Sequence, residues 1–445
     1  MKLSEIAPTL REIGVSPVKS LGQNFLHDRN LAKWLVDQAN ISPEDFIVEI
    51  GPGLGALTEL ALAKGARISA IEKDKRLVQF LREKFQGHAL EVVHGDALEF
   101  DTRMLYAQPK VKLLGNLPYY ISSQLLIKFL EYPSPISMWL FMLQKELARR
   151  LVATPATRDY GALTLLVQLN HRVEYLRTIP ASVFLPKPEV DSALVRISPR
   201  DPRELPACDQ VVFEKLVRRG FAQRRKQLGK LIREELPKWE IAAAELGLNA
   251  KARAEELSLE QWIALTNYVA PIASGSSEAG QEESFSIVDQ SDRVIGSAPR
   301  GQVHANNLLH RAVHLLIFNS AEEVFLQLRS RRKDRHPLLW DSSAAGHVNA
   351  GEECDQAAAR ELTEELGIQI PLEKVAKLTA PERTDCEFVS LYYGSHDGEL
   401  RLNQNEIEAG QFFPRSIVDG WIKARPRDFA PAFLECWKIW RERNS

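Results

Sequence analysis

The sequence predicts two different folds in one chain, an α/β domain with a mostly parallel sheet followed by a smaller α+β domain. Strand-like and helical segments alternate over the first part of the chain, which is typical of right-handed crossover units. The stretch PIASGSSEAGQEES at 271–284 holds only one large apolar residue, Ile272, and therefore predicts a flexible linker. The length of 445 residues suits two or three domains.

The first domain is predicted from strands and helices that follow one another in order. A strand at 46–50 precedes a glycine turn, and the pattern becomes helical from about 205 to 268. The remaining predicted strands of this part lie at 66–72, 90–96 and 111–117. Its predicted helices lie around 57–64 and 75–85. We therefore expect an α/β domain at 1–200 and a helical subdomain at 201–270.

The second domain, 285–445, is predicted to mix strands with one strong helix. FSIVD, AVHLLIF and EVFLQLR have the β-branched and aromatic content of strands. Residues 353–366 have the spacing of an amphipathic helix. This combination predicts an α+β fold.

Composition excludes several classes of protein. Hydrophobic residues make up 44% and charged residues 26%, so a wholly disordered or fibrous chain is not expected. No apolar run is long enough to span a membrane, and the N-terminus lacks the apolar core of a secretory signal. The four cysteines are scattered singly, which suits neither a zinc site nor a disulfide framework. We therefore expect a cytoplasmic protein without a membrane partner.

Charge is distributed unevenly along the chain. Residues 1–270 carry 37 Lys and Arg against 32 Asp and Glu, whereas residues 271–445 carry 20 against 27. Within the first part, residues 101–233 carry 22 against 11. A basic region joined to an acidic one predicts two domains with different partners.

A glycine turn in the first domain has the setting of a nucleotide-binding loop. EIGPGLGA (49–56) follows a strand and opens a helix, and Gly51 and Gly53 allow the backbone to approach a ligand closely. Glu72 ends the next strand, where a carboxylate can accept from both ribose hydroxyls, and Asp96 ends the third strand, where it can accept from an adenine amine. A tight turn with solvated strand ends is the alternative. The ordered set favours a nucleoside ligand.

The segment Asn116-Leu117-Pro118-Tyr119 follows a fourth strand and suits chemistry on an aromatic amine. The Asn116 side chain and the Leu117 carbonyl, oriented by Pro118, can accept both N–H hydrogens of adenine N6 and favour a pyramidal nitrogen. Such catalysis rests on positioning and electrostatics. Tyr119 offers a ring on which an extruded base can stack. The alternative is a strand-ending turn with a core tyrosine.

Seven motifs occur in the order found in one family of enzymes. They are KSLGQNFLHD (19–28), VEIGPGLGALT (48–58), GDAL (95–98), GNLPYYISS (115–123), MLQKELARR (142–150), FLPKPEVDSALV (184–195) and FAQRRKQL (221–228). Over about residues 10–268 the chain resembles the small-subunit ribosomal RNA adenine dimethyltransferases. The resemblance implies a Rossmann-like fold, S-adenosylmethionine as cofactor and dimethylation of two adjacent adenosines near the 3′ end of the rRNA in an assembling small subunit.

The resemblance also assigns roles to individual residues. Asn116 to Tyr119 match the clamp on the target amine, and Phe184 matches a second base-stacking aromatic. The positions that match cofactor contacts are Asn24, Leu26, Gly51, Glu72, Asp96 and Asn116, to which the glycine argument adds Gly53. The large-subunit methyltransferases of macrolide resistance share the clamp, but GNLPYYISS and the VDS run favour the small-subunit family.

A basic segment at 215–233 is predicted to be a helix that contacts RNA phosphates. Only Glu214 offers a nearby counter-charge along the sequence. The residues expected to bind RNA are Arg218, Arg219, Arg224, Arg225 and Lys226. A solvated charged face is the alternative.

The second domain contains a carboxylate helix suited to a metal ion and a diphosphate. Residues 346–368 read G-x5-E-x7-R-E-L-x-E-E-x-G-I, and Glu361, Glu364 and Glu365 share one helix face. These three, with Glu352 from the preceding loop, are hard oxygen ligands that suit Mg²⁺ or Mn²⁺. We expect Arg360 to orient a carboxylate and Gly367 to adopt the left-handed cap.

This pattern is the complete Nudix box, so the domain resembles hydrolases of nucleoside-diphosphate-linked compounds. LHRAVHLLIF (309–318), PLLWDSSAAGHV (337–348), NEIEAG (405–410) and DFAPAFLE (428–435) resemble the isopentenyl-diphosphate-isomerase-like branch. In that resemblance His304, His310 and His347 lie near the isomerase's metal-binding histidines, although each also suits a strand or loop. Ala345 replaces the isomerase's essential cysteine, which favours diphosphate hydrolysis over isomerisation.

Together these features predict an rRNA adenine N6-dimethyltransferase fused to a metal-dependent Nudix hydrolase that acts on a diphosphate-containing small molecule. The alternative is a ribosome-assembly or RNA-binding factor with a non-hydrolytic or isomerase-type Nudix domain. Intact clamp residues and a full set of box glutamates favour the enzyme. The sequence does not identify the substrate of the Nudix domain, the oligomeric state or the purpose of the fusion.

Overall fold

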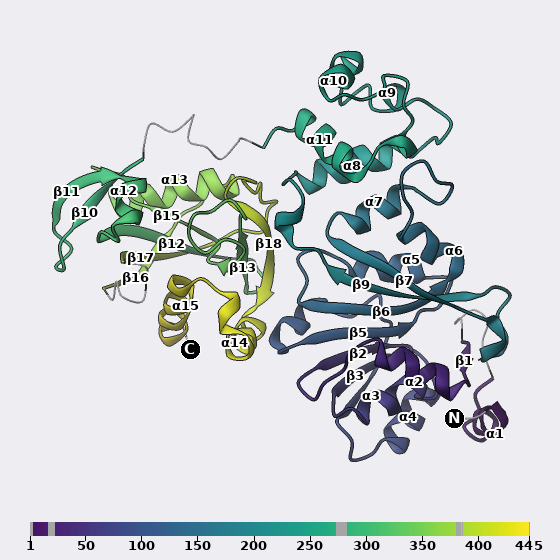
Figure 1. The fold of residues 1–445 in the computed structure, drawn as a ribbon. Coiled ribbons are helices and arrows are strands. Elements are labelled where there is room, and N and C mark those ends of the chain that lie inside the picture. The colour runs from purple at the N-terminus through teal and green to yellow at the C-terminus, as the bar shows by residue number, and fades with distance from the viewer. Residues whose placement is uncertain (1–2, 17–22, 273–282, 380–383, 385, 445) are drawn as a thin grey trace. The chain divides into compact units, whose positions relative to one another are not determined.

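The chain forms two compact units, Met1–Pro271 and Ile272–Ser445 (Figure 1). The computed structural model describes residues 3–16, 23–272, 283–379, 384 and 386–444. Most of the predicted linker and residues 19–22 of the first motif lie outside these ranges. None of the described helices is long and apolar enough to cross a membrane.

The first unit is built on a seven-stranded sheet with the order β4-β3-β2-β5-β6-β9-β7. The strands from β4 to β6 are parallel, and β9 is antiparallel to both β6 and β7. The strands are β2 (Phe46–Ile50), β3 (Arg67–Glu72), β4 (Leu90–His94), β5 (Val111–Asn116), β6 (Ile136–Gln144), β7 (His171–Ile179) and β9 (Ser192–Pro199). A separate pair joins β1 (Phe25–Leu26) to β8 (Phe184–Leu185). The predicted mostly parallel sheet is confirmed.

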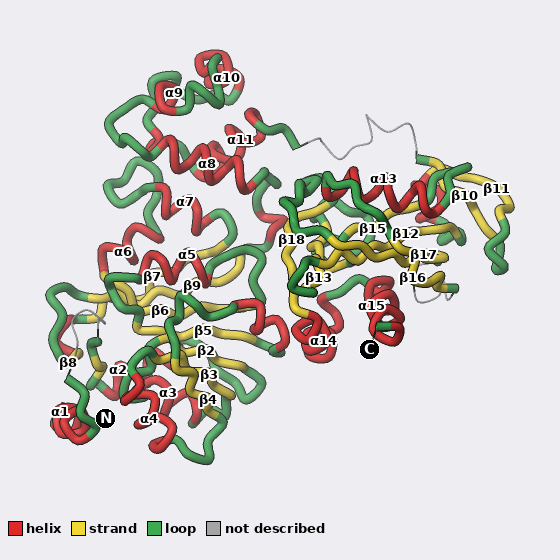
Figure 2. The backbone as a smooth tube through the Cα atoms, turned by 180° about the vertical axis from the view of Figure 1, so that it is seen from behind, coloured by secondary structure: helices red, strands yellow, loops and turns green. Residues whose placement is uncertain are grey.

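Helices cover both faces of this sheet (Figure 2). Adjacent strand residues point to opposite faces, so Leu113 packs in one buried cluster with Phe129, and Leu114 packs in the other with Leu35. The helices are α1 (Leu3–Glu12), α2 (Arg29–Asp37), α3 (Ala56–Leu62), α4 (Lys75–Lys84), α5 (Ser122–Phe129), α6 (Lys145–Leu151) and α7 (Ala162–Gln168). Burial on both faces explains why the strands read as continuous apolar runs.

The predicted helical subdomain follows the sheet. It contains α8 (Gln210–Gly220), α9 (Leu228–Leu231), α10 (Trp239–Glu245) and α11 (Leu259–Val269). The prediction of one basic helix over 215–233 is wrong, because α8 ends at Gly220 and a turn precedes α9. A Cβ on Gly220 would lie 2.6 Å from the ring of Trp262, so glycine lets α11 pack closely at this helix end.

The second unit contains a nine-stranded sheet in which β12 pairs in parallel with β17 and antiparallel with β15. The strands are β10 (Ser284–Val288), β11 (Val294–Pro299), β12 (His310–Phe318), β13 (Glu323–Arg329), β14 (Trp340–Asp341), β15 (Ala344–His347), β16 (Glu373–Leu378), β17 (Glu387–Ser395) and β18 (Ile407–Pro414). The helices are α12 (Arg300–Ala305), α13 (Cys354–Leu366), α14 (Arg415–Ala424) and α15 (Pro431–Arg443).

Helix α13 carries the predicted carboxylate face and packs on the sheet through its opposite side. Leu362 and Leu366 join the buried cluster formed with β12. The helix ends at Gly367, whose φ of 67° confirms the predicted left-handed cap. The packing of α13 fixes which side chains can face the neighbouring cavity.

Candidate functional sites

A cleft lies at the carboxyl ends of the parallel strands of the first unit. Ligands of parallel sheets usually bind at this edge. Six residues predicted to contact a cofactor line this cleft together: Asn24, Gly51, Gly53, Glu72, Asp96 and Asn116. The structure thus gathers positions that are spread over more than ninety residues of sequence.

The glycine turn holds Glu72 through backbone groups. Gly51 and Gly53 have φ values of 64° and 57°, a region that disfavours larger residues. The two oxygens of Glu72 accept hydrogen bonds from the N–H groups of Gly53, at 3.3 Å, and Asp74, at 2.9 Å. Burial raises the pKa of Glu72 above its usual value. The carboxylate is therefore fixed in place at the end of β3.

Asp96 is held by a backbone group and by a lysine. Its Oδ1 accepts from the N–H of Leu98 at 2.9 Å, and its Oδ2 lies 2.7 Å from Nζ of Lys73. The hydrogen bond with Lys73 lowers the pKa of Asp96. Asp96 is therefore ionised and able to accept a further hydrogen bond from a ligand.

The Asn116 side chain is oriented by the backbone of the N-terminal segment. Its Nδ2 donates to the carbonyl of Asn24 at 3.0 Å, so Oδ1 remains to accept an N–H group. Next to it, the carbonyl of Pro118 accepts from Oγ of Ser122 at 2.8 Å, which fixes the turn. The hydroxyl of Tyr119 lies 2.6 Å from Oγ of Ser192 and so joins the NLPY and VDS motifs.

Four predicted residues do not line the cleft. Leu26 and Phe184 pair across β1 and β8, and both are buried in the core at 7% and 3% exposure. Leu117 is buried, and Tyr119 is half-buried beside Ser192. The structure therefore does not present the Phe184 ring to the cleft, and its proposed stacking on a base remains a prediction.

Phe25, Lys73 and Tyr120 are among the lining residues of the cleft that sequence reasoning did not single out. Each directly follows a residue of a predicted motif, and this adjacency was the available signal. The side chain of Tyr120 is exposed at 54%. Lys73 differs from the other two because it brings a positive charge to Asp96.

The predicted RNA-binding side chains fall into two groups. Contrary to the prediction, Glu214 is not the only counter-charge: Arg218 pairs with Glu214, but Arg219 pairs with Glu234 and Glu235, and Arg224 pairs with Glu255. Glu234 and Glu235 directly follow the basic segment along the chain, whereas Glu255 lies about thirty residues beyond Arg224, where sequence spacing does not reveal the pairing. Arg225 and Lys226 are exposed and have no ion pair with any described residue.

The second unit contains a cavity that is lined by Glu361, Glu364 and Glu365. The predicted shared face of these glutamates is therefore confirmed. Gly346 faces the same helix so closely that a Cβ there would lie 2.0 Å from the Glu361 carboxyl carbon. This approach explains why the box begins with glycine.

Arg360 organises the carboxylates of this cavity, as predicted. It donates to both oxygens of Glu352 at 3.0 Å, to Glu361 at 2.7 Å and to Glu364 at 3.1 Å. It also donates to the carbonyl of His347. Glu352 is consequently bound in a bidentate pair and does not line the cavity, so its role as a metal ligand stays a prediction.

Burial raises the pKa values of Glu361 and Glu365. Burial, reinforced by the charge of Glu365, raises the pKa of Glu361 to about 7. Glu365 is 2% exposed, and burial raises its pKa although the N–H of Ala345 and the amide of Gln327 donate to it. Two close, buried carboxylates of this kind favour a bound cation or a proton.

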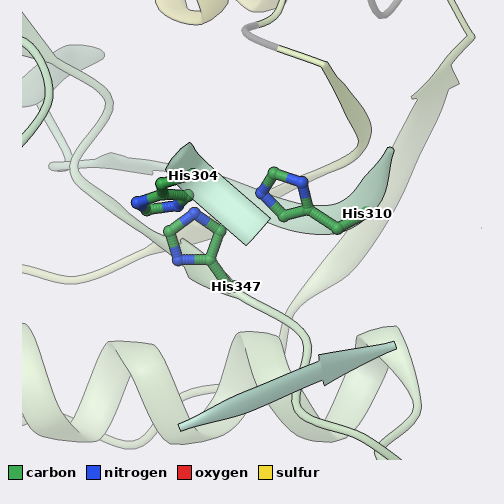
Figure 3. Close-up of side chains that lie close together, drawn as sticks. All are labelled: His304, His310 and His347. Atoms are coloured by element: carbon green, nitrogen blue, oxygen red, sulfur yellow. The ribbon is translucent and has the colours of Figure 1, made fainter. Parts of the chain in front are cut away.

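Three histidines form a second group (Figure 3), and two of them, His304 and His347, line this cavity. Ligand atoms of His304, His310 and His347 all lie within 4.8 Å of one another. Glu387, which the sequence did not single out, lies 3.3 Å from His347 and 3.5 Å from His310. Asp334 binds Nδ1 of His304 at 2.7 Å, and Nε2 of His304 is buried without a hydrogen-bond partner.

The electrostatics of this cluster suit a metal ion. Burial lowers the pKa of His347 to about 4, so its ring is neutral near pH 7. The two neighbouring histidines lower the pKa of Glu387 in spite of its burial. Neutral imidazoles with one carboxylate are a common ligand set for Zn²⁺, Mn²⁺ and Fe²⁺. The parallel pairing of β12 with β17 places Glu387 beside His310. No spacing along the sequence indicates this contact.

Cationic side chains line the same cavity, where Arg329 pairs with Asp341 and Lys333 pairs with Glu406. Arg300, Arg329, Lys333 and Arg335 line the same cavity. Burial lowers the pKa of Lys333, while the charge of nearby Glu365 opposes this effect. Carboxylates and cations in one cavity suit a ligand that carries both a metal ion and phosphate groups.

Comparison with known proteins finds two matches along the chain. Residues 16–271 match the model of the ribosomal RNA adenine dimethylase family, and residues 308–433 match the NUDIX domain. Ribosomal RNA small subunit methyltransferase A of Halothermothrix orenii is 38% identical over 270 residues, covering 58% of this chain and 90% of its own. The protein of the same name from Pseudomonas fluorescens is 41% identical over 254 residues, covering 57% and 93%. The crystal structure of the 23S rRNA methyltransferase ErmE is 29% identical, covers 55% and 99%, and has a TM-score of 0.46.

Proposed function

Because the chain belongs to the ribosomal RNA adenine dimethylase family and also carries a NUDIX domain, we propose that it combines two specific activities. The first is dimethylation of N6 on two adjacent adenosines near the 3′ end of small-subunit rRNA. The second is hydrolysis of a diphosphate-containing small molecule. Its relatives named small subunit methyltransferase A support the first activity, with S-adenosylmethionine as cofactor.

The cleft at the strand ends supports the first proposal. Glu72 and Asp96 offer acceptors to a ribose and an adenine, and Ile71, Ala97 and Leu125 supply apolar walls for a base. Asn116 lies in the same cleft, so the groups for the cofactor and the groups for the amine share one space. This arrangement is the observation on which the methyltransferase proposal rests.

The amine clamp acts through positioned acceptors. S-adenosylmethionine, when bound, supplies an electrophilic methyl group. Oδ1 of Asn116 accepts one N–H of the target amine, and the carbonyl of Leu117 accepts the other, which turns the nitrogen lone pair towards the methyl group. Each transfer replaces one N–H hydrogen, which leaves as a proton. No strong base is needed, because preorganised acceptors stabilise the charge that develops on nitrogen.

The test is methylation of undermethylated small ribosomal subunits by the full chain with labelled S-adenosylmethionine. We expect N6,N6-dimethyladenosine at two adjacent positions near the 3′ end of the rRNA. Cofactor binding without methylation would instead favour an assembly factor that uses the same fold. Methylation of large-subunit rRNA alone would favour the macrolide-resistance type of activity.

The proposal for the second unit rests on opposed charges in one cavity. Glu361, Glu364 and Glu365 offer oxygen ligands, while Arg329 and Lys333 can bind phosphate oxygens. A bound Mg²⁺ or Mn²⁺ would neutralise phosphate charge and lower the pKa of an attacking water. Attack by water at one phosphorus would break its bond to the oxygen that bridges the two phosphates. The two products would each carry a phosphate group. Arg360 holds Glu361 and Glu364 in a shared orientation for this ligand set.

The histidine cluster favours a second cation site near the first. His304, His310, His347 and Glu387 offer nitrogen and oxygen ligands, whereas the glutamate face offers oxygen ligands alone. We expect this site to prefer Zn²⁺ or Mn²⁺ over Mg²⁺, since imidazole suits these ions better. Metal analysis of the full chain after loading with Mn²⁺ would show one ion fewer in His347→Ala. His88→Ala, in the first unit, is the matched control.

Ala345 argues against an isomerase. Its methyl group can neither donate nor accept a proton at the position where the resembling isomerases carry a cysteine. The full chain should be incubated with Mg²⁺ and isopentenyl diphosphate and, separately, with nucleoside diphosphates and dinucleotides. We expect hydrolysis of a member of the second panel. Isomerised product with no hydrolysis of any panel member would overturn the hydrolase proposal.

A further inference from the structure

Lys73 and Asp96 form an ion pair in the cofactor cleft of the first unit. The parallel strands β3 and β4 end side by side, with Glu72 in register with His94. Lys73 directly follows β3 and Asp96 follows β4 by two residues, so both side chains emerge at the same edge of the sheet. Nζ of Lys73 lies 2.7 Å from Oδ2 of Asp96, and both residues line the cleft.

This pair occupies the acceptor that the cofactor is proposed to use. Oδ1 of Asp96 already accepts from the N–H of Leu98, and Oδ2 accepts from Lys73. Neither oxygen is without a partner before a ligand arrives. An adenine amine that approaches Asp96 must therefore displace the ammonium group, share Oδ2 with it, or share Oδ1 with the N–H of Leu98.

We propose that Lys73 is a positioning residue that competes with the adenine amine for Asp96 and thereby weakens cofactor binding. The inference rests on the proposed role of Asp96 as the acceptor for adenine. It adds a residue that sets cofactor affinity without taking part in methyl transfer. Opening of the ion pair then precedes or accompanies entry of the adenine.

The exposure of the pair determines the size of the effect. The side chains of Lys73 and Asp96 are 53% and 21% exposed, so water and salt screen their attraction. Exposed ion pairs of this kind change equilibrium constants by about two- to fivefold. Lys73 is therefore expected to tune the affinity for the cofactor, not to block its entry.

The experiment measures binding of S-adenosylmethionine and S-adenosylhomocysteine to the full chain by calorimetry. Lys73→Met keeps the aliphatic stem and removes the charge, and we expect it to bind both ligands about two- to fivefold more tightly. The gain should be equal for the two, because they share the adenine and differ at the sulfonium. A gain for S-adenosylmethionine alone would indicate long-range repulsion of the sulfonium and would overturn the competition.

Two further comparisons isolate the ion pair. Lys75→Met is the matched control, because Lys75 is an exposed lysine at the start of α4 and does not line the cleft. It should bind both ligands as the natural chain does. Raising the salt concentration should reduce the difference between the natural chain and Lys73→Met. Weaker binding by Lys73→Met would show that the lysine is a ligand and would overturn the proposal.

Asp96→Asn separates failure of this inference from failure of the proposed cofactor site. If Asp96 accepts from adenine, this substitution alone weakens binding, and adding Lys73→Met to it gives no further gain. A gain in the double variant equal to that in Lys73→Met would mean that Lys73 acts by another route. Unchanged binding by Asp96→Asn would remove Asp96 from the cofactor site and the competition with it.

Discussion

The two cavities differ in what holds their functional side chains. In the first unit, backbone groups hold Glu72 and Asn116: the N–H groups of Gly53 and Asp74 bind the former, and the carbonyl of Asn24 binds the latter. In the second unit, side chains hold one another, as Arg360 does for three glutamates. A hydrogen bond to a backbone group persists when the side chain of that residue is substituted. A hydrogen bond to a side chain is lost when that side chain is substituted. Substitutions should therefore act locally in the first cavity and propagate in the second.

The largest expected effect tests the local character of the first cavity. Asn116→Ala removes an acceptor for the target amine and leaves the Asn24 carbonyl, Glu72 and Asp96 in place. Loss of one preorganised transition-state contact typically costs about 10²–10³-fold in rate. We therefore expect methyl incorporation into undermethylated small subunits to fall by that factor, while calorimetry shows nearly unchanged binding of S-adenosylmethionine.

Asn170→Ala is a suitable control for this variant, because Asn170 lies in the same unit and binds Gln210 away from the cleft. It should methylate normally. Near-normal methylation by Asn116→Ala would contradict the assignment of the clamp. Loss of cofactor binding together with methylation would show that this cavity, like the other, depends on a coupled network.

Glu49 differs from Glu72 and Asn116 of the same unit, because a side chain and not a backbone group binds it. Oγ1 of Thr58 donates to its carboxyl group at 2.7 Å, and burial raises its pKa from 4.5 to about 7. The folded state therefore binds this proton more tightly than the unfolded state. The contribution of Glu49 to the free energy of unfolding is greatest below pH 4.5, decreases between pH 4.5 and 7, and is lowest above pH 7, with a total change of about 3 kcal/mol.

Glu49→Gln keeps the acceptor for Thr58 and removes the titration. Relative to the natural chain, we expect it to stabilise the first unit above pH 7 and to have little effect near pH 5. Hydrogen exchange of the β2 amides, compared between the two proteins at each pH, measures this difference in the first unit alone. Equal protection at pH 8 would contradict the buried, high-pKa state of Glu49.

Glu365→Gln tests whether substitutions propagate in the second cavity. The charge of Glu365 helps to raise the pKa of Glu361 to about 7, so its removal should lower that pKa. Divalent metal binding, which requires deprotonated carboxylates, should then extend to lower pH even as the lost ligand weakens it. We expect turnover of a diphosphate substrate to fall about 100-fold at pH 8 and its pH profile to move towards acid.

The readout that distinguishes coupling is the pH profile and not the loss of turnover. Glu364→Gln serves as the comparison, because its side chain is 54% exposed and its charge is a smaller influence on Glu361 than that of Glu365. It should leave the profile nearly in place. A profile that is identical in Glu365→Gln and the natural chain would show that the cavity's carboxylates act independently.

The same difference between the cavities explains what the sequence could predict. Gly51, Glu72 and Asn116 lie at the ends of strands β2, β3 and β5, which are neighbours in the sheet. The order of the motifs and of the strands therefore suffices to bring them together. Helical spacing places Glu361 and Glu365 on one face for a similar reason. Glu387 meets His310 only through the pairing of β12 with β17, which no spacing along the chain encodes.

Tertiary packing also explains why several predicted residues lie in other surroundings than the sequence suggested. Phe184 and Leu26 are buried because β8 pairs with β1, and neither strand has a periodic pattern long enough to reveal its partner. Glu255 neutralises Arg224 from a segment about thirty residues further along the chain. In each case the deciding contact joins segments that are distant in sequence.

The smallest expected effect concerns Arg225 and Lys226, the two predicted RNA-binding residues with no ion pair among the described residues. Reversing both charges should weaken binding to small-subunit rRNA and reduce its salt dependence. Each lost phosphate contact should lower the log–log salt slope by about 0.7 for single-stranded RNA and by about 0.9 for a duplex. Filter binding at several salt concentrations measures the slope directly.

Arg224→Glu is the comparison that tests the role of internal pairing. Arg224 binds Glu255 and donates to the carbonyls of Arg158 and Tyr160, so it joins the helical subdomain to the segment before α7. Its reversal places two negative charges together and leaves both carbonyls without this donor, so it should destabilise the subdomain by about 1–3 kcal/mol. A residue already paired within the protein gains little from a phosphate, so in the folded fraction the salt slope should change less than for Arg225 and Lys226. The opposite ranking, with a larger slope change for Arg224 and no loss of stability, would mean that RNA replaces Glu255 as its partner.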